Sequence, residues 1–388
     1  MQSIQTTFSN LYKKAPAVVV QSPGRINLIG EHTDYNNGFV LPAAINKVVQ
    51  VAIASRNDNE IHLHAIDLNE TEVVDVTNII PHAKHWVNYV IGVVAQVQQY
   101  IKAQSTNNIK INGFDICIQG DIPIGAGLSS SAAVECAVLF SLNELYTIGL
   151  SRMQMALMTQ KAEHEFAGVQ CGIMDMFASL HGKKNQVILL DCDSLTYQYY
   201  PLDLKEYSIV LLDTQIKHSL ASSEYNKRRL ECEEGLAIIQ QQYPAVKTFR
   251  DITIQQVETC LSNHATIIYN RCKYVVEEIE RVQKAVKDLL AGNLKAFGQK
   301  MFETHQGLSV LYEVSCPELD ILVQAVSANE NVLGARMMGG GFGGCTINII
   351  KTDQVDQITA AVKKLYIEKT SRDLQMYKVS IEEGTHLI

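Results

Sequence analysis

The sequence predicts an α+β protein of two domains, and three observations support this. The chain has 388 residues, enough for two domains of ordinary size, and 47% of them are hydrophobic, which supports packed cores. Strand-like and helix-like runs are mixed along its length. A polar segment at 191–205 lies between two strand-like runs, so we expect one domain at 1–205 and a second at 206–388.

Composition excludes several classes of protein. The net charge is −8 and no long basic run occurs, so we expect no nucleic-acid partner. The apolar runs are too short to cross a bilayer, and the polar start of the chain, Met1 to Ser9, lacks a signal-peptide core, so we expect no membrane association. Nine cysteines, an odd number at scattered positions, favour reduced thiols in a cytoplasmic protein.

In chain order, the residue pattern predicts strands of the first domain at 17–21, 47–55, 61–66, 114–118 and 186–190. We expect Pro23-Gly24 to end the first strand, and the second and third to belong to an antiparallel sheet. Helical spacing predicts helices at 85–101, 132–145 and 151–166. The last helix has an apolar face, and Glu163 lies off it, where a carboxylate is usually solvated.

The second domain begins with a strand at 207–212, and 232–327 is mostly helical. Within this region apolar residues recur every three or four positions, which indicates a helix packed on a core: Val276, Ile279, Val282, Val286 and Leu289. Gly292 is a suitable stop for that helix. A further strand is predicted at 345–350.

One glycine-rich stretch has the order of a phosphate site. A strand leads into Pro123-Ile-Gly-Ala-Gly-Leu-Ser-Ser-Ser131, and an apolar helix follows. Such a turn directs several backbone N–H groups to one point, with the positive end of the helix dipole behind them. The residues expected to hold phosphate are Gly125, Ala126, Gly127, Leu128, Ser129, Ser130 and Ser131. The alternative is that Ser129 or Ser130 only caps the helix.

A second stretch, Pro23 to Pro42, contains Glu31-His-Thr-Asp34. Carboxylates accept hydrogen bonds from hydroxyl groups and an imidazole can donate or accept them, so this polar density suits a molecule rich in hydroxyls. The alternative is a solvated loop. No signal from spacing alone decides between the two.

A third stretch, Gly334 to Thr346, contains Gly339-Gly-Gly-Phe-Gly-Gly344 and fits the dinucleotide pattern Gly-x-Gly-x-x-Gly. That fingerprint requires a following helix, whereas a strand-like run follows here. We therefore expect a loop packed close to an active site. No Gly-x-x-x-x-Gly-Lys-[Ser/Thr] sequence occurs, which excludes a Walker-type loop.

Together, in their order along the chain, the three stretches resemble the motif set of the GHMP small-molecule kinases, and the stretch from Pro23 to Pro42 resembles the galactokinase signature. The resemblance runs from about Ser22 to Ile350. It implies an N-terminal ribosomal-protein-like domain, a C-terminal ferredoxin-like domain and an active site between them. It also implies ATP-dependent phosphorylation of D-galactose at the C1 hydroxyl, in galactose catabolism, by a monomer that uses Mg²⁺.

The same resemblance implies roles for individual residues. Asp175, in an otherwise apolar surround, matches the catalytic base and Arg25 its electrostatic partner, although a buried structural Asp is the alternative. Ser131 and Glu163 match the Mg²⁺ ligands, an oxygen donor set that suits this ion. The residues that match the sugar site are Glu31, His32, Thr33, Asp34, Gly172 and Tyr225.

Two alternative functions stay open at this point. One is a kinase for a related sugar, such as N-acetylgalactosamine or L-arabinose, on the same scaffold. The other is a regulator that binds galactose and ATP without turnover. The intact Ser-Ser-Ser-Ala-Ala run, together with Asp175 and Arg25, favours the enzyme.

Overall fold

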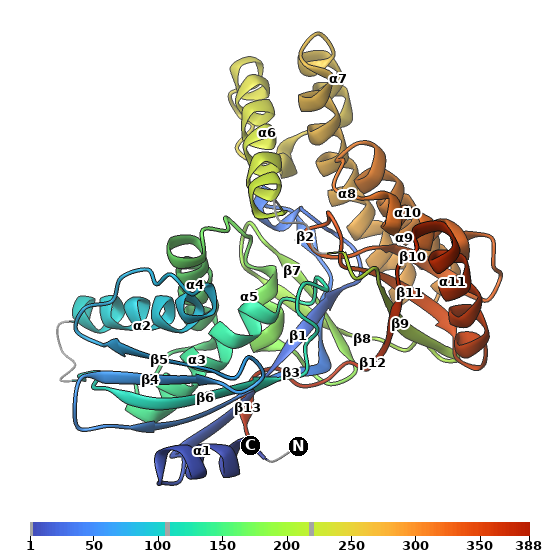
Figure 1. Cartoon of the computed structure of the whole chain (residues 1–388). Coiled ribbons are helices and arrows are strands. Elements are labelled where there is room, and N and C mark those ends of the chain that lie inside the picture. The colour runs from blue at the N-terminus through green and yellow to red at the C-terminus, as the bar shows by residue number, and fades with distance from the viewer. Residues whose placement is uncertain (1–2, 105–108, 217–220) are drawn as a thin grey trace.

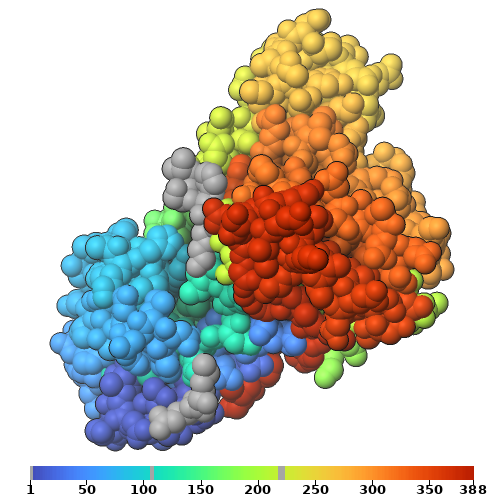
Figure 2. Space-filling model, turned by 45° about the vertical axis from the view of Figure 1, so that its right-hand side comes forward, coloured from blue at the N-terminus to red at the C-terminus, as the bar shows by residue number. Residues whose placement is uncertain are grey.

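The computed structural model describes residues 3–104, 109–216 and 221–388, and its fold is α+β, as the sequence predicts. Figure 1 shows one sheet with its helices, formed mainly by the N-terminal part of the chain, and a second sheet with its helices, formed by the C-terminal part. In Figure 2 the residues coloured blue to cyan and those coloured orange to red form two lobes, and the yellow residues extend beyond the second lobe. Among the described residues, no helix combines the length and apolar character needed to cross a membrane.

The first sheet has six strands in the order β13-β1-β3-β6-β4-β5. Their bounds are β1 Val18–Asn27, β3 Pro42–Ser55, β4 Glu60–Ala65, β5 Glu70–Asp75, β6 Phe114–Gly120 and β13 His386–Leu387. Alternate residues of β3 face opposite sides, so Val51 and Ile53 join the main core whereas Ala52 and Ala54 pack under α1 (Ile4–Tyr12). The main core is covered by α2 (His85–Ala103), α3 (Ser130–Tyr146), α4 (Arg152–Ala162) and α5 (Met174–His181).

Two predictions about this sheet are wrong. The sheet is mixed, because β4 pairs with β6 in parallel, with Ile61 opposite Phe114. Along the chain, strand β5 and helix α2 come between β4 and β6 and form the long crossover that a parallel pair requires. Pro23-Gly24 does not end β1. A register shift between Pro23 and Arg25 accommodates the two residues, and the strand continues to Asn27.

The predicted helix at 151–166 also changes character. Its α-helical part ends at Ala162, and Glu163–Ala167 (η2) form a π-helical turn. Such turns are rare and occur often at functional sites. Glu163, which the pattern placed off the apolar face, is 7% exposed and therefore buried.

The second sheet has the order β10-β11-β9-β12, with β9 Tyr207–Asp213, β10 Val332–Met337, β11 Cys345–Lys351 and β12 Gln375–Val379. It packs with α9 (Leu294–Val310), α10 (Pro317–Ser327) and α11 (Val355–Thr370). The predicted helical region contains α6 (Ala221–Gln242), α7 (Ile254–Leu261) and α8 (Thr266–Leu290), and the five apolar positions predicted on α8 are all buried. The prediction that a strand follows the third glycine-rich stretch is confirmed by β11.

A small sheet of β2 (Phe39–Val40), β7 (Gln186–Asp191) and β8 (Tyr197–Pro201) lies between these parts, and β8 occupies the segment that the sequence marks only as polar. The end of the chain returns to the first sheet, where β13 pairs with β1. The division into 1–205 and 206–388 stays a proposal. The change of sheet between β8 and β9 supports a boundary near residue 205, with the last residues rejoining the first unit.

Candidate active site

A cavity of about 300 Å³ is lined by residues from all three stretches singled out in the sequence. Of the predicted site residues, those that line it are Arg25, Glu31, His32, Asp34, Gly125, Gly127, Leu128, Ser129, Ser130, Ser131, Glu163, Asp175 and Tyr225. The other predicted residues do not line the cavity: Thr33 and Ala126 lie between residues that do, and Gly172 follows the lining residue Cys171. The size is within the usual range for small-molecule sites.

The glycine-rich loop before α3 contains positive φ angles, which few residue types other than glycine adopt easily. Gly125 and Gly127 have φ values of 81° and 74°, and Ser129 has 58°. Ser129 precedes α3, but its side chain makes no capping bond to the helix. Its hydroxyl donates instead to Asp175 Oδ2 at 2.5 Å. The alternative that the side chain of Ser129 caps the helix is therefore wrong.

Arg25 and Asp175 form an ion pair at the edge of this loop. Arg25 Nε donates to Asp175 Oδ1 at 2.8 Å, and another guanidinium nitrogen donates to Gly127 O at 2.5 Å. Burial would lower the pKa of Arg25, but the charges of Asp175 and Glu31 outweigh this effect and raise it. Both residues line the cavity, and Asp175 is the more accessible of the two, since its side chain is 25% exposed and that of Arg25 is 4% exposed.

Three carboxyl groups gather near the start of α3. Ser131 Oγ donates to Glu163 Oε1 at 3.0 Å. Burial, followed by the charge of Asp175, raises the pKa of Glu163 to about 7. Glu135, four residues after Ser131 on the same helix face, is fully buried beside Glu163, and burial raises its pKa well above the ordinary value. Neither carboxyl oxygen of Glu135 has a hydrogen bond of normal geometry in the described structure.

The sugar-signature residues His32 and Asp34, with Tyr225, line the same cavity. His32 has φ 63°, its Nδ1 lies 2.7 Å from Tyr35 Oη, and its buried Nε2 has no partner in the described structure. Burial, together with the charge of Arg228, lowers the pKa of His32 to about 3, so the ring is neutral. Tyr225, on α6, lies beside it with ring centroids 5.2 Å apart.

Asp34 and Gly172 fit each other closely. A Cβ atom at Gly172 would lie 2.0 Å from Asp34 Oδ2, so only glycine leaves room for this carboxylate. Thr33 holds the loop from behind, since its hydroxyl donates to Gly30 O at 2.9 Å and to Phe39 O at 2.7 Å. Thr33 and Gly172 therefore help to set the position of Asp34 at the cavity.

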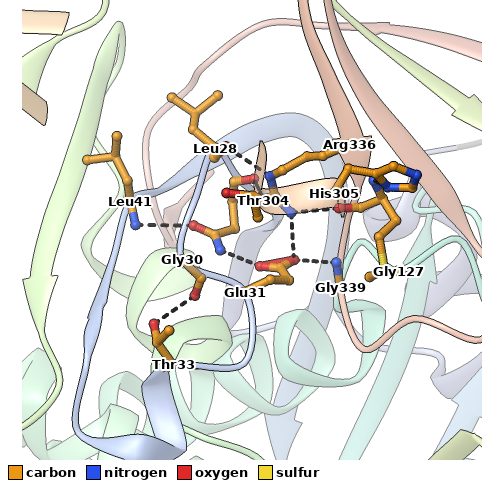
Figure 3. Close-up of polar contacts among 12 residues, drawn as sticks. Leu28, Gly30, Glu31, Thr33, Leu41, Gly127, Thr304, His305, Arg336 and Gly339 are labelled. Carbon is orange, nitrogen blue, oxygen red and sulfur yellow. Dashed lines mark hydrogen bonds and ion pairs between the residues drawn. The ribbon is translucent and has the colours of Figure 1, made fainter. Parts of the chain in front are cut away.

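Glu31 joins the second stretch, Pro23 to Pro42, to the third, Gly334 to Thr346 (Figure 3). Its Oε1 accepts from the Gly339 backbone N–H and its Oε2 accepts from the Asn27 side chain. Arg336, on β10, lies on the same side, with a guanidinium nitrogen 3.7 Å from Glu31 Oε1. The third stretch is thus a loop packed against the site, as predicted.

The sequence interpretation missed some residues that shape the site. Glu135 could have been found, because it is the one charged residue in the apolar run 132–142 and lies one helical turn after Ser131. Arg336 has a similar signal, a cation between Ala335 and Met337, and a charged residue among apolar neighbours is usually paired if it is buried. Tyr312, whose hydroxyl lies 2.9 Å from that of Tyr35, has no comparable signal.

Family comparisons agree with this geometry. Three family models match the chain: the galactokinase galactose-binding signature at residues 6–55, the GHMP kinases N terminal domain at 88–183 and the GHMP kinases C terminal domain at 285–368. The galactokinase of Clostridium beijerinckii is 40% identical over 390 residues, covering 99% of this chain and 98% of that protein. This chain belongs to the galactokinase family.

Other galactokinases agree over the full length. The enzyme of Thermotoga neapolitana is 39% identical and covers 95% of this chain and 99% of its own. The crystal structure of Lactococcus lactis galactokinase complexed with galactose superposes with a TM-score of 0.93 at 32% identity, covering 99% of both chains. A mevalonate kinase from Methanococcus jannaschii, at 18% identity and a TM-score of 0.63, shares the fold.

The buried position of Asp34 predicts a pH-dependent stability cost. Burial and the charge of Asp175 raise its pKa to about 7, well above the value of about 4 expected in the unfolded chain. The folded state therefore binds the proton of Asp34 more tightly than the unfolded chain does. The stabilisation that this proton gives the folded state is fully present below about pH 4 and is lost as the pH rises through 7. In thermal melts without ligand, we expect Asp34→Asn to melt above the parent at pH 8, by a margin that shrinks at pH 5.

Asp58 provides the control for this prediction. It is exposed, and hydrogen bonding to Arg56 lowers its pKa to about 2, so Asp58→Asn should bring no gain at pH 8. A melting temperature of Asp34→Asn equal to or below that of the parent at pH 8 would contradict the assigned cost.

Proposed function

We propose that this chain phosphorylates D-galactose at its C1 hydroxyl with ATP, giving α-D-galactose 1-phosphate and ADP. The observation that carries the proposal is the juxtaposition in one cavity of a phosphate-type loop, the Arg25–Asp175 pair and the galactose signature. Membership of the galactokinase family supports the same reaction, since galactokinases are ATP-dependent kinases. Phosphoryl transfer depends mainly on positioning and charge stabilisation, and the cavity offers both.

The phosphate end of the reaction belongs to the loop at 125–131. Its backbone N–H groups and the N-terminal end of α3 provide partial positive charge where the β- and γ-phosphates of ATP would lie. Arg25 adds a full positive charge next to the loop through its bond to Gly127 O. These groups would stabilise the charge that develops on the transferred phosphoryl group.

Asp175 is placed to act on the sugar hydroxyl. Arg25 holds Oδ1 and Ser129 holds Oδ2, so the carboxylate has a fixed orientation at the cavity wall. Each carboxylate oxygen keeps a further acceptor site, with which Asp175 would orient the C1 hydroxyl and take its proton. Asp34, Glu31 and the unpartnered Nε2 of His32, which line the same cavity, would bind the remaining hydroxyls, with Tyr225 beside His32.

The residues near Ser131 fit a magnesium ion. Ser131 Oγ and a carboxylate oxygen of Glu163 would hold it, and hard oxygen donors of this kind suit Mg²⁺. Burial, followed by the charge of Asp175, raises the pKa of Glu163, and a bound divalent cation would favour its charged form. No cluster of three or more His, Cys, Asp or Glu side chains suited to a metal occurs in the described part of the chain, so phosphate oxygens and water would complete the coordination. The ion would supply neutralisation of phosphate charge.

The alternatives are less well supported. A kinase for N-acetylgalactosamine or arabinose, and a non-catalytic sensor, both conflict with full-length relatives named galactokinase and with a galactose-bound structural neighbour. We further propose a cytoplasmic location, because all nine cysteines are free thiols. That the enzyme acts as a monomer, without a nucleic-acid or membrane partner, stays a prediction.

The direct test is ATP consumption with Mg²⁺ against galactose, N-acetylgalactosamine, arabinose and glucose. We expect turnover with galactose and little with the others. Binding of galactose and ATP by calorimetry without turnover would support the sensor, and preference for another sugar would overturn the substrate assignment. Mevalonate serves as a non-sugar control.

The role of Asp175 predicts a specific loss in Asp175→Asn. An amide keeps the shape of the side chain and can still bond to its neighbours, but it cannot take the hydroxyl proton. We expect kcat to fall by roughly 100-fold or more, with the far-ultraviolet spectrum unchanged. Activity near that of the parent would refute the assignment of Asp175 as the base.

The magnesium proposal predicts a different pattern for Glu163→Gln. The amide removes the negative charge that would attract the cation, so the Mg²⁺ concentration at half-maximal rate should rise by roughly tenfold or more. Binding of Mn²⁺ together with an ATP analogue, followed by electron paramagnetic resonance, checks this without turnover. Gln160→Glu, one turn earlier on α4, adds a carboxylate nearby as a charge control. Unchanged Mn²⁺ affinity in Glu163→Gln would remove Glu163 from the metal site.

A further inference from the structure

Arg336 is a fully buried cation in β10, outside the machinery assigned above. It is 0% exposed. Its Nε donates to Leu28 O at 3.0 Å, and its two terminal nitrogens donate to Met337 O at 2.6 Å and to Asn27 O. Figure 3 shows the guanidinium at the centre of these contacts, directly beside Glu31. A buried arginine is costly unless its charge is balanced, and Glu31 is the carboxylate in reach.

The contacts of Arg336 join two parts of the fold. Asn27 and Leu28 lie at the end of β1, in the first sheet, whereas Arg336 belongs to the second sheet. The backbone of β10 is itself held tightly, because a Cβ at Gly298 of α9 would lie 2.1 Å from Leu333 O. The guanidinium thus projects from a rigid strand onto the segment that leads into the sugar signature.

Residues from several elements hold Glu31 in place. Its carboxylate accepts from the Gly339 N–H and the Asn27 side chain, and its backbone carbonyl accepts from Tyr274 Oη at 2.9 Å. Asn27 is fixed in turn, since its Oδ1 accepts from the Leu41 N–H at 3.1 Å. Glu31 is 1% exposed and lines the cavity, so little freedom remains for its side chain.

We propose that Arg336 is a positioning residue for sugar binding. It acts through Glu31, by fixing the charged carboxylate and the adjoining loop in the geometry that accepts a sugar hydroxyl. The inference rests on the proposed function. Two features separate this role from a purely structural one. The charge of Arg336 faces a cavity-lining carboxylate, and two of its three carbonyl acceptors, those of Asn27 and Leu28, belong to the galactose-binding signature shortly before Glu31.

The role predicts a selective effect on sugar affinity. Arg336→Lys keeps the positive charge but cannot reproduce three directed bonds from one plane. We expect its galactose Kd, measured by calorimetry, to rise roughly tenfold, the size of a lost charge-assisted hydrogen bond. The KM for ATP should change by less than about twofold, within the usual range for a site that is not touched. Arg271→Lys is the matched control, since Arg271 is also buried but is paired with Glu231, a carboxylate that does not line the cavity.

A double-mutant cycle with Glu31→Gln tests whether Arg336 acts through Glu31. We expect Arg336→Lys to have little further effect on galactose Kd once Glu31 is uncharged. Multiplying effects in the double variant, an unchanged Kd in Arg336→Lys, or equal losses for galactose and ATP would overturn the inference. Arg336→Gln is a second variant if Arg336→Lys does not fold, and failure of both to fold would make Arg336 a structural residue.

The parent protein keeps the two proposals distinguishable. Absence of galactose turnover by the parent would overturn the proposed function, whatever the variants do. Turnover by the parent, together with unaltered galactose binding by a folded Arg336→Lys, would overturn only the positioning role.

Discussion

The ion pair between Arg25 and Asp175 is the interaction on which the rest of the site depends. Arg25 lies on β1, Asp175 in the first turn of α5, and the guanidinium also binds the glycine-rich loop through Gly127 O. One buried cation therefore fixes a strand, a helix and a loop relative to one another. The bulge at Pro23 and Gly24 makes this possible, because it lets β1 continue to carry Arg25 into the site.

Several carboxyl groups are crowded around the cavity, an arrangement that lowers the stability of the ligand-free protein. Asp34 and Glu163 have pKa values raised to about 7, and Glu135 is buried without hydrogen-bond partners of normal geometry. Such crowding of carboxyl groups costs free energy in the ligand-free protein. Functional sites often carry shifted pKa values for this reason. A sugar with many hydroxyls and a hydrated cation would satisfy groups that the chain leaves poorly satisfied.

Further contacts hold the cavity-lining residues of the sugar signature in place. Tyr35 fixes Nδ1 of His32, Gly172 leaves room for Asp34, and the Asn27–Arg336–Gly339 set surrounds Glu31. Both His32 and Ser129 adopt positive φ values, a conformation that costs a non-glycine residue of order 1 kcal/mol and is often found at active sites. The supporting contacts come from both sheets, so the sugar side of the cavity depends on how the two parts of the chain pack.

The sequence alone determined the fold class, the family and most cavity-lining residues, because glycine turns, polar clusters and helical spacing are local patterns that a chain displays directly. It also separated the third glycine stretch from a dinucleotide fold by the strand that follows. Tertiary structure decided the rest. Ser129 bonds Asp175 rather than its own helix, a π-helical turn buries Glu163, β4 and β6 pair in parallel, and Arg336 meets Glu31. Each depends on contacts between residues far apart in the chain, and a local pattern carries no information about the partner that packing brings to it.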